Sequence, residues 1–281
     1  MPELPEIKAH AERLHALFEG VVLDHFRVLH PSALKTFDPR PDSLNGLAVR
    51  QVTHRGKHLL VEVDRSEPAW FVIHLMQGGR LRPDPKQSPR PRGGMARWTF
   101  ADGRALLLTE AGTEHRAGVW VVSGDTSSSE PLTGLGPDAD TVTREELSVL
   151  LKGKSERLHG WLRNQRNIAG IGRLLANEVL HAAKISPFAV SSKITEIQTD
   201  RLHAAIGSSI ERALAHERSL PDMGKSADRP SDVHHRIGEP CPVCGNSILS
   251  VEYRRYTVAY CPDCQTGGRK LADNTTSKFL K

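Results

Sequence analysis

The sequence contains few cysteines, few aromatic residues and no long apolar run. Aromatic residues make up only 5% of the 281 residues. No segment reaches the roughly eighteen consecutive apolar residues that a membrane helix needs, and the polar N-terminal segment does not resemble a secretory signal peptide. From these absences we expect a cytoplasmic protein with no membrane partner.

The charge balance favours a polyanionic partner only slightly. Lysine and arginine total 38 against 33 acidic residues, which gives a net charge of +5 and an isoelectric point near 9.1. A modest basic excess is compatible with nucleic-acid binding but is too small to indicate it alone. The length is sufficient for two or three compact units, each with its own core.

The cysteines are more informative, because they all lie in one C-terminal segment. Two C-x2-C pairs with sixteen intervening residues are formed by Cys241, Cys244, Cys261 and Cys264. This spacing is typical of one tetrahedral, structural Zn²⁺ ion held by two knuckles. Two disulfides, or redox-active C-x-x-C pairs, are the alternatives. The absence of a secretion signal disfavours two disulfides, which form mainly in oxidising compartments. A redox-active site needs only one C-x-x-C pair, so two pairs disfavour that alternative.

The hydrophobic period divides the rest of the chain. A period of two predicts strands at 21–30, 47–56, 57–64, 70–77, 96–110 and 117–122, with a turn at 101–103 inside the fifth segment. Consecutive strands without intervening helices indicate an antiparallel sandwich or barrel. A period of 3.6 then predicts helices at 144–153, 156–165, 172–185 and 195–217. The alternating stretch between the two cysteine pairs predicts a β-hairpin, and hence a zinc ribbon.

These patterns predict three modules. An N-terminal β domain covers residues 1–125, and a linker rich in Ser, Gly and Pro covers 126–143. A helical domain follows at 144–235, and the zinc ribbon occupies 236–281.

The first residues, MPELPE, allow two interpretations. Pro and Glu are typical of a first helical turn, so a helix over residues 5–18 explains much of the pattern. Removal of Met1 would instead leave Pro2 with a secondary amine, which is nucleophilic near neutral pH. Glu3 would then lie beside this amine as a proton donor or acceptor, and Glu6, three residues later, would share its helical face if the helix extends that far back.

Two further features interrupt regular patterns. Lys57 falls on the apolar side of a predicted strand, so it either reaches solvent at the strand end or lines a cleft. The turn IAGIGR, with Gly170, Gly172 and Arg173, opens a predicted helix. It is not a dinucleotide fingerprint, because Leu175 stands where a third glycine is required. A helix start with a nearby arginine favours phosphate binding instead.

Together the MPELPE terminus, the strand-opening lysine in GKHLLVEV, the IAGIG turn and the ribbon ending CPDCQ closely resemble the formamidopyrimidine-DNA glycosylase and endonuclease VIII family. The similarity extends from Pro2 to about Gln265. It implies an α+β multidomain fold: an N-terminal helix with an antiparallel β-sandwich, a helix-two-turn-helix domain and a C-terminal zinc ribbon.

The resemblance also implies a function, a bifunctional DNA glycosylase and AP lyase that excises oxidised bases. Pro2 matches the nucleophile that forms a Schiff base with the sugar, Glu3 the proton donor, and Glu6 a further carboxylate of the pocket. Lys57 matches a lysine that contacts phosphate near the lesion. The implied enzyme is a bacterial, cytoplasmic, nucleoid-associated monomer that flips a nucleotide out of damaged double-stranded DNA and cleaves the strand by β-elimination.

The positions that the resemblance assigns to DNA binding are Met76, Gln77, His115, Arg116, Gly170, Gly172, Arg173, Arg255 and Tyr256. Three positions depart from the family pattern. Arg173 replaces an asparagine, Ala117 a phenylalanine, and Tyr256 the arginine at the ribbon tip, with Arg255 one residue earlier. An alternative function is therefore a family member with altered or lost catalysis that binds damaged DNA. A zinc-ribbon module without a DNA role would leave the N-terminal residues unexplained.

Overall fold

The structure is a computed structural model that describes residues 1–224, 228–253 and 256–272. The chain divides into two compact units. The first comprises Met1–Gly134 with Leu220–Ser226, and the second comprises Leu135–Ser219 with Ala227–Lys281. In the described ranges, no helix is both long enough and apolar enough to cross a membrane.

The first unit begins with helix α1, Leu4–Phe18, close to the expected residues 5–18. Glu3 is its N-cap, and Pro5 suits the first turn because it needs no backbone N–H partner there. Apolar residues recur along one face, and Ile7, Leu14 and Phe18 are almost fully buried. The helix packs on strands β2 (Val49–Arg55) and β3 (His58–Val63), so its N-terminus is fixed relative to the sheets.

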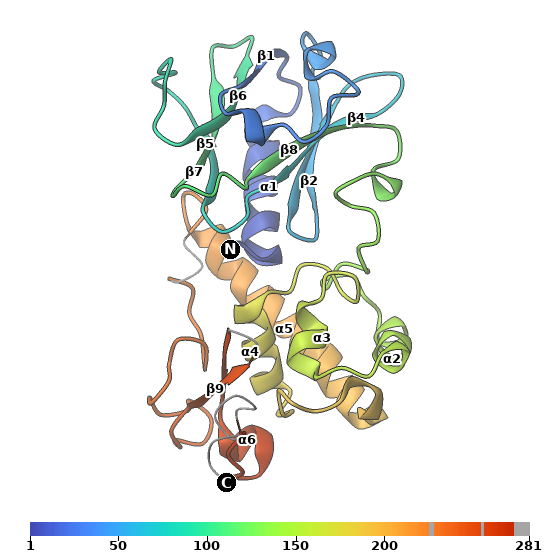
Figure 1. Cartoon of the computed structure of the whole chain (residues 1–281), viewed down its shortest axis with the longest axis vertical. Coiled ribbons are helices and arrows are strands. Elements are labelled where there is room, and N and C mark those ends of the chain that lie inside the picture. The colour runs from blue at the N-terminus through green and yellow to red at the C-terminus, as the bar shows by residue number, and fades with distance from the viewer. Residues whose placement is uncertain (225–227, 254–255, 273–281) are drawn as a thin grey trace. The chain divides into compact units, whose positions relative to one another are not determined.

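Two antiparallel four-stranded sheets form the sandwich (Figure 1). The first has the order β1 (Leu23–Val28), β6 (Gly94–Phe100), β7 (Ala105–Glu110) and β5 (Gly79–Pro83), and the second has β2 (Val49–Arg55), β3 (His58–Val63), β4 (Ala69–His74) and β8 (Gly118–Ser123). Their shared core contains Phe26 and Trp98 from one sheet and Phe71 from the other, with ring centroids 5.0–5.8 Å apart. The predicted strands are present, and β5 is an additional strand.

The first hairpin places Lys57 differently from the expectation. Arg55 pairs with His58, so Gly56 and Lys57 form a two-residue turn rather than the start of the strand. Gly56 has a φ of +55°, which glycine adopts without steric cost. Lys57 is nevertheless only 5% exposed, so its charge does not escape to solvent at the strand end.

The segment after helix α5 (Glu196–Ser219) returns to the first unit. Met223 belongs to the sandwich core and is 3% exposed. Asp222 forms an ion pair with Arg82 of β5 at 2.8 Å. The first unit therefore includes a short segment that lies about a hundred positions after Gly118–Ser123, the last strand of the sandwich.

Over its described residues, the second unit contains five α-helices and a two-stranded ribbon. Its elements are α2 (Arg144–Gly153), α3 (Leu158–Arg163), α4 (Arg173–Ala182), α5 (Glu196–Ser219), β9 (Leu249–Tyr253), β10 (Tyr256–Tyr260) and α6 (Pro262–Thr266). Short 3-10 helices in the two units are Pro31–Ala33, Pro41–Leu44, Thr126–Ser128 and Ser191–Lys193. Helix α4 packs against α3 and α5, and also against β10 and α6 (Figure 1). The expected class, a helix with antiparallel sheets followed by helices and a cysteine ribbon, is confirmed.

Candidate functional site

The N-terminal turn gathers the first three predicted site residues. Glu3 and Glu6 form a reciprocal capping box, in which each side chain accepts the other's backbone N–H, and the Glu3 N–H lies 2.9 Å from Glu6 Oε2. Both carboxylates are buried, at 4% and 0% exposure, and Pro2 beside them is buried as well. Burial lowers the pKa of the nearby Arg80, and the Glu6 charge opposes that shift. The two glutamates therefore have a structural role that positions them next to Pro2.

Lys57 lies among histidines whose rings stay neutral. His58 and His74 are cross-strand neighbours with ring centroids 4.6 Å apart. Burial is the main cause that lowers the pKa of His74 to about 4, and the positive charge of Lys57 adds to it. His74 Nδ1 accepts the Met76 N–H at 2.9 Å, so the ring proton is on Nε2. This site therefore combines an ammonium with a neutral imidazole donor, a set suited to a phosphate.

One pocket brings the N-terminus and the predicted DNA-contacting loops together. It has a volume of about 350 Å³ and is lined by Met1, Met76, Gln77, Gly78, Glu110, Ala111, Glu114 and Arg116. This volume is in the range of small-molecule sites in proteins. The structure therefore places Met76, Gln77 and Arg116 around the same space as the residue that precedes Pro2.

The loop 111–117 is anchored at its base. Glu110 is 5% exposed and accepts the Ala117 N–H. Ala117 itself is fully buried, so it does not extend toward a ligand. His115 is not among the pocket-lining residues, because its ring stacks on His30 at 4.2 Å between centroids. Arg116 is the exposed cation of this loop and pairs with Glu114 at 3.2 Å.

In the second unit, the glycine turn lies before α4 as predicted from the sequence. Gly170 has a φ of +100°, and its N–H donates to Gln165 Oε1 at 2.9 Å. Gly172 is the N-cap of α4 and has no side chain to accept the first-turn N–H groups. Arg173 is the first helical residue and is exposed. This arrangement offers backbone donors and a cation to an anion.

The cysteines converge at the ribbon. Their sulfur atoms all lie within 4.8 Å of one another, and Cys241–Cys264 and Cys244–Cys261 are separated by 3.9 Å and 3.4 Å. Four sulfurs at about 2.3 Å from a tetrahedral Zn²⁺ would be about 3.8 Å apart, so the arrangement fits that ion. His181 of α4 lies with Nε2 3.2 Å from Cys241 Sγ, and this contact links the helix to the cysteine cluster.

Comparison with known proteins supplies the family. A sequence model of the formamidopyrimidine-DNA glycosylase N-terminal domain matches residues 1–113, and one of the formamidopyrimidine-DNA glycosylase H2TH domain matches residues 133–222. The chain belongs to the formamidopyrimidine-DNA glycosylase family. An uncharacterized formamidopyrimidine-DNA glycosylase-like protein of Mycobacterium tuberculosis is 40% identical over 149 residues, 52% of this chain and 94% of the relative. The Escherichia coli formamidopyrimidine-DNA glycosylase is 27% identical over 274 residues, 94% of this chain and all of the relative.

Solved structures share the fold of this family member. MutM in complex with carbocyclic 8-oxo-G containing DNA matches 94% of this chain and 100% of its own, with a TM-score of 0.82 and 22% identity. The Lactococcus lactis Fpg in complex with an abasic site containing DNA matches 94% and 99% of the two chains, with a TM-score of 0.82 and 21% identity.

The ribbon tip of this family member contains a contact that the sequence did not predict. Arg255 lies outside the described residues. Tyr256 begins β10. The guanidinium carbon of Arg163, the last residue of α3, lies over the Tyr256 ring at 3.9 Å from its centre. Sequence patterns gave no indication of this contact, because Arg163 only appears as a polar residue at a helix end.

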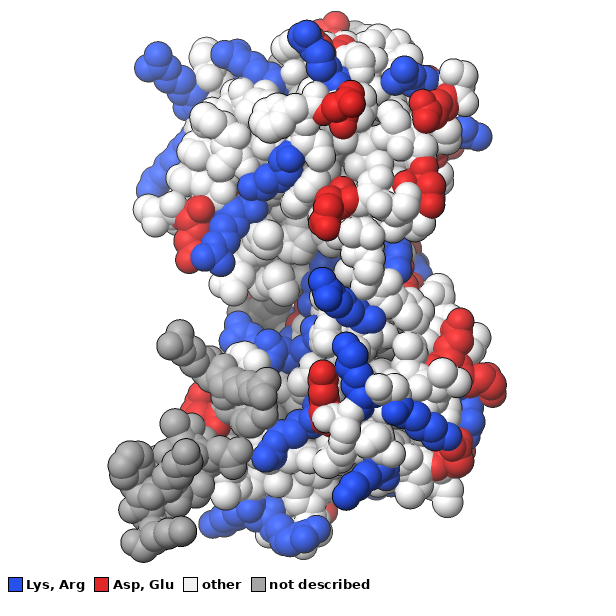
Figure 2. Space-filling model, turned by 45° about the vertical axis from the view of Figure 1, so that its right-hand side comes forward, with Lys and Arg blue, Asp and Glu red and all other residues white. Residues whose placement is uncertain are grey.

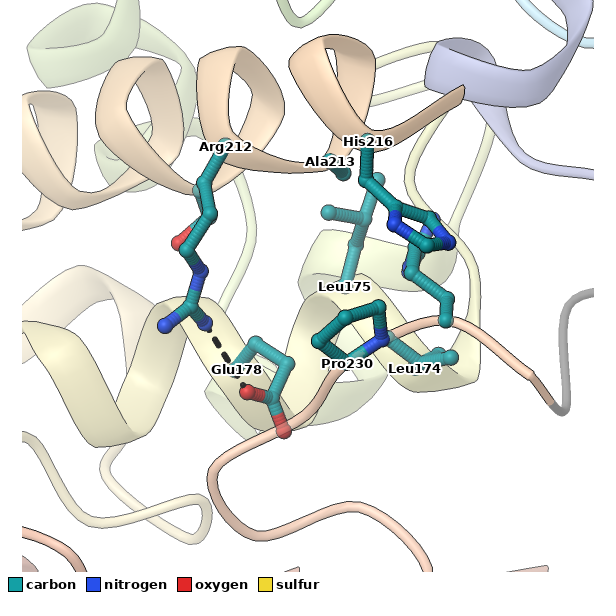
Figure 3. Close-up of a pocket in the computed structure, with 9 residues that line it drawn as sticks. Leu174, Leu175, Glu178, Arg212, Ala213, His216 and Pro230 are labelled. Carbon is teal, nitrogen blue, oxygen red and sulfur yellow. Dashed lines mark hydrogen bonds and ion pairs between the residues drawn. The ribbon is translucent and has the colours of Figure 1, made fainter. Parts of the chain in front are cut away.

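The sequence patterns did not indicate two other residues of the site. His74 ends an apolar strand, and a polar residue at the end of such a strand is the feature that could have indicated it. Glu178 is buried in α4 at 3% exposure and pairs with Arg212 of α5 at 3.2 Å (Figure 3). A pocket of about 90 Å³ lies beside this pair, between the two helices and Pro230 (Figure 3). It is much smaller than typical ligand sites and is a gap in the packing.

Proposed function

We propose that this family member is a bifunctional DNA glycosylase and AP lyase that acts on oxidised bases in double-stranded DNA. The observation that carries the proposal is the N-terminal turn, where Pro2 adjoins two buried carboxylates at the edge of a pocket lined by Met1. Two findings support the substrate class. The Escherichia coli relative is named a formamidopyrimidine-DNA glycosylase, and the two solved relatives are bound to DNA that contains a lesion.

The chemistry begins with the secondary amine of Pro2, after Met1 has been removed. Its nitrogen lone pair forms a bond to C1′ of the damaged nucleotide, and the bond from C1′ to the base breaks with its electron pair remaining on the base. The departing base takes up the proton that the Pro2 nitrogen releases, which restores a lone pair on that nitrogen. Protonation of the ring oxygen opens the sugar and gives an iminium between C1′ and Pro2. Loss of a C2′ proton then expels the 3′ phosphate, which is β-elimination.

Glu3 and Glu6 are the two carboxylates of the reaction site, and they have different roles. Glu3 donates the proton that opens the sugar ring, and Glu6 shapes the same pocket. Their reciprocal capping box is compatible with this role, because it fixes both carboxylates before any substrate arrives. Lys57 and the neutral His74 hold the neighbouring phosphate by charge and by an N–H donor.

The DNA grip comes from both units. In the first unit, Met76, Gln77 and Arg116 contact the strands around the flipped nucleotide, and the contacts offset the energy of unstacking. In the second, Gly170, Gly172 and Arg173 bind backbone phosphate. One structural Zn²⁺ held by Cys241, Cys244, Cys261 and Cys264 fixes the ribbon when bound.

Covalent trapping tests the proposal. Protein whose mass confirms the loss of Met1 is incubated with a duplex carrying one abasic site and reduced with borohydride. We expect a covalent protein–DNA band that disappears in Pro2→Gly with folding unchanged, and that is strongly reduced in Glu3→Gln. Glu19→Gln, which removes an exposed carboxylate at the other end of the same helix, is the matched control and should retain the band.

The alternative is a damaged-DNA-binding protein without this chemistry. Ala117 favours it, because a fully buried alanine cannot fill the gap left by a flipped base as a phenylalanine would. Salt-dependent binding to lesion-containing duplex without any trapped band would support this alternative and would contradict the lyase.

A further inference from the structure

Arg163 and Tyr256 belong to different elements and meet at the ribbon tip. The guanidinium carbon of Arg163 lies 3.9 Å from the centre of the Tyr256 ring, within the range of a cation–π contact. Stacking covers a face of the guanidinium but leaves its N–H groups at the edge, in the plane of the group. Tyr256 therefore orients a cation that comes from α3 rather than from the ribbon.

The backbone of Arg163 is also fixed to the glycine turn. The side-chain amide of Gln165 donates to the carbonyl oxygens of Arg163 and Ile171, both at 2.8 Å. Its oxygen accepts the Gly170 N–H at 2.9 Å. One side-chain amide thus joins the end of α3 to the turn before α4. The backbone of Arg163 is therefore fixed relative to this turn.

Arg173 is the first residue of α4, so it directly follows the glycine turn that Gln165 joins to Arg163. His159 is buried at 1% exposure, and burial lowers its pKa to about 3, with smaller contributions from the positive charges of Arg163 and Arg173. In the described part of the chain, no side chain forms an ion pair or hydrogen bond with either guanidinium. Figure 2 shows a face of the second unit on which Lys and Arg side chains gather, while Asp and Glu lie mainly toward one edge.

We propose that Arg163, oriented by Tyr256, binds a phosphate of the DNA backbone together with Arg173. Neither cation is neutralised by a carboxylate, so a phosphate that contacts both is favoured by both charges. The flat fork of a guanidinium matches two phosphate oxygens, so Arg163 can bind a phosphate through two parallel N–H donors. The family pattern has an arginine at the position of Tyr256. In this chain Arg163 of α3 supplies the cation instead. This inference rests on the proposed function only in that the partner is DNA.

The test is equilibrium binding of the full, zinc-loaded chain to a duplex with a non-cleavable abasic analogue, measured by fluorescence anisotropy at several KCl concentrations. For Arg163→Gln we expect about a tenfold higher Kd and a salt slope lower by about 0.9, the value for one phosphate contact. Tyr256→Phe should keep both values near wild type, because it retains the aromatic face. Tyr256→Leu should lose most of the affinity that Arg163→Gln loses.

Arg201→Gln is the matched control, since it removes an exposed cation of α5. It should leave the slope unchanged, and thermal unfolding should show that all variants are folded. A wild-type slope for Arg163→Gln, or equal losses for Tyr256→Phe and Tyr256→Leu, would overturn the inference while leaving the proposed function intact. Failure of the wild-type protein to bind the duplex would overturn the proposed function, and the inference with it.

Discussion

Replacing Glu178 by Gln should selectively loosen the segment that leads from α5 to the ribbon. Glu178 Oε2 accepts the Asp232 N–H at 2.6 Å, and Oε1 accepts the N–H groups of Val233 and His234 at 3.1 Å and 2.9 Å. A single buried carboxylate therefore satisfies three consecutive backbone donors. Arg212 adds an ion pair at 3.2 Å, but it is half exposed and contributes little.

The magnitude follows from the number of acceptor positions. Glutamine keeps one oxygen, which can still accept two of the three N–H groups. Its amide nitrogen replaces the other oxygen and faces a donor, which leaves the partly buried N–H of Asp232 without its partner. Loss of this bond to a charged acceptor, together with weaker bonds to the remaining two donors, costs about 3 kcal/mol. Because about 1.4 kcal/mol corresponds to a factor of ten, the segment should open about a hundred times more often.

Hydrogen exchange measures this opening directly. In Glu178→Gln, we expect the amides of residues 232–234 to lose about a hundredfold in protection, while the amides of the first unit remain unchanged. Glu211→Gln, which neutralises an exposed carboxylate of α5, is the control and should have no effect. Wild-type protection of residues 232–234 in Glu178→Gln would refute the assignment of the carboxylate as their anchor.

Two other predictions concern pH and the metal. Burial lowers the pKa of His10 to about 4, so its neutral form is stabilised in the folded state and its contribution to stability is complete above pH 6.5. The contribution of His10 to stability should fall by up to about 1.4 kcal/mol per pH unit as pH decreases from 6.5 toward 4, so thermal unfolding of His10→Gln should show a smaller fall than the wild type. Chelation of Zn²⁺ should destabilise the ribbon and release one zinc per chain, measured with a colorimetric indicator. Cys244→Ser should contain no tightly bound zinc, and full zinc occupancy in that variant would contradict the four-cysteine site.

Much of the secondary structure followed from local patterns. The helix at the N-terminus and α2 were predicted within about a residue of Leu4–Phe18 and Arg144–Gly153. In contrast, the helix predicted to end at Ile185 ends at Ala182, and β5 was not predicted at all. The stretch Gly79–Pro83 is short and contains two arginines and a proline, so its pairing with β7 comes from the sheet rather than from its own residues.

The sequence by itself determined the period of each segment, the helix start at MPELPE and the cysteine spacing that fits Zn²⁺. These are local properties, because backbone geometry and ligand spacing act over a few residues. The tertiary structure decided that Arg163 meets Tyr256, that Lys57 lies beside His74, and that Glu178 caps residues 232–234. Such contacts join residues far apart in the chain, and they depend on strand register and helix packing, which no single segment encodes.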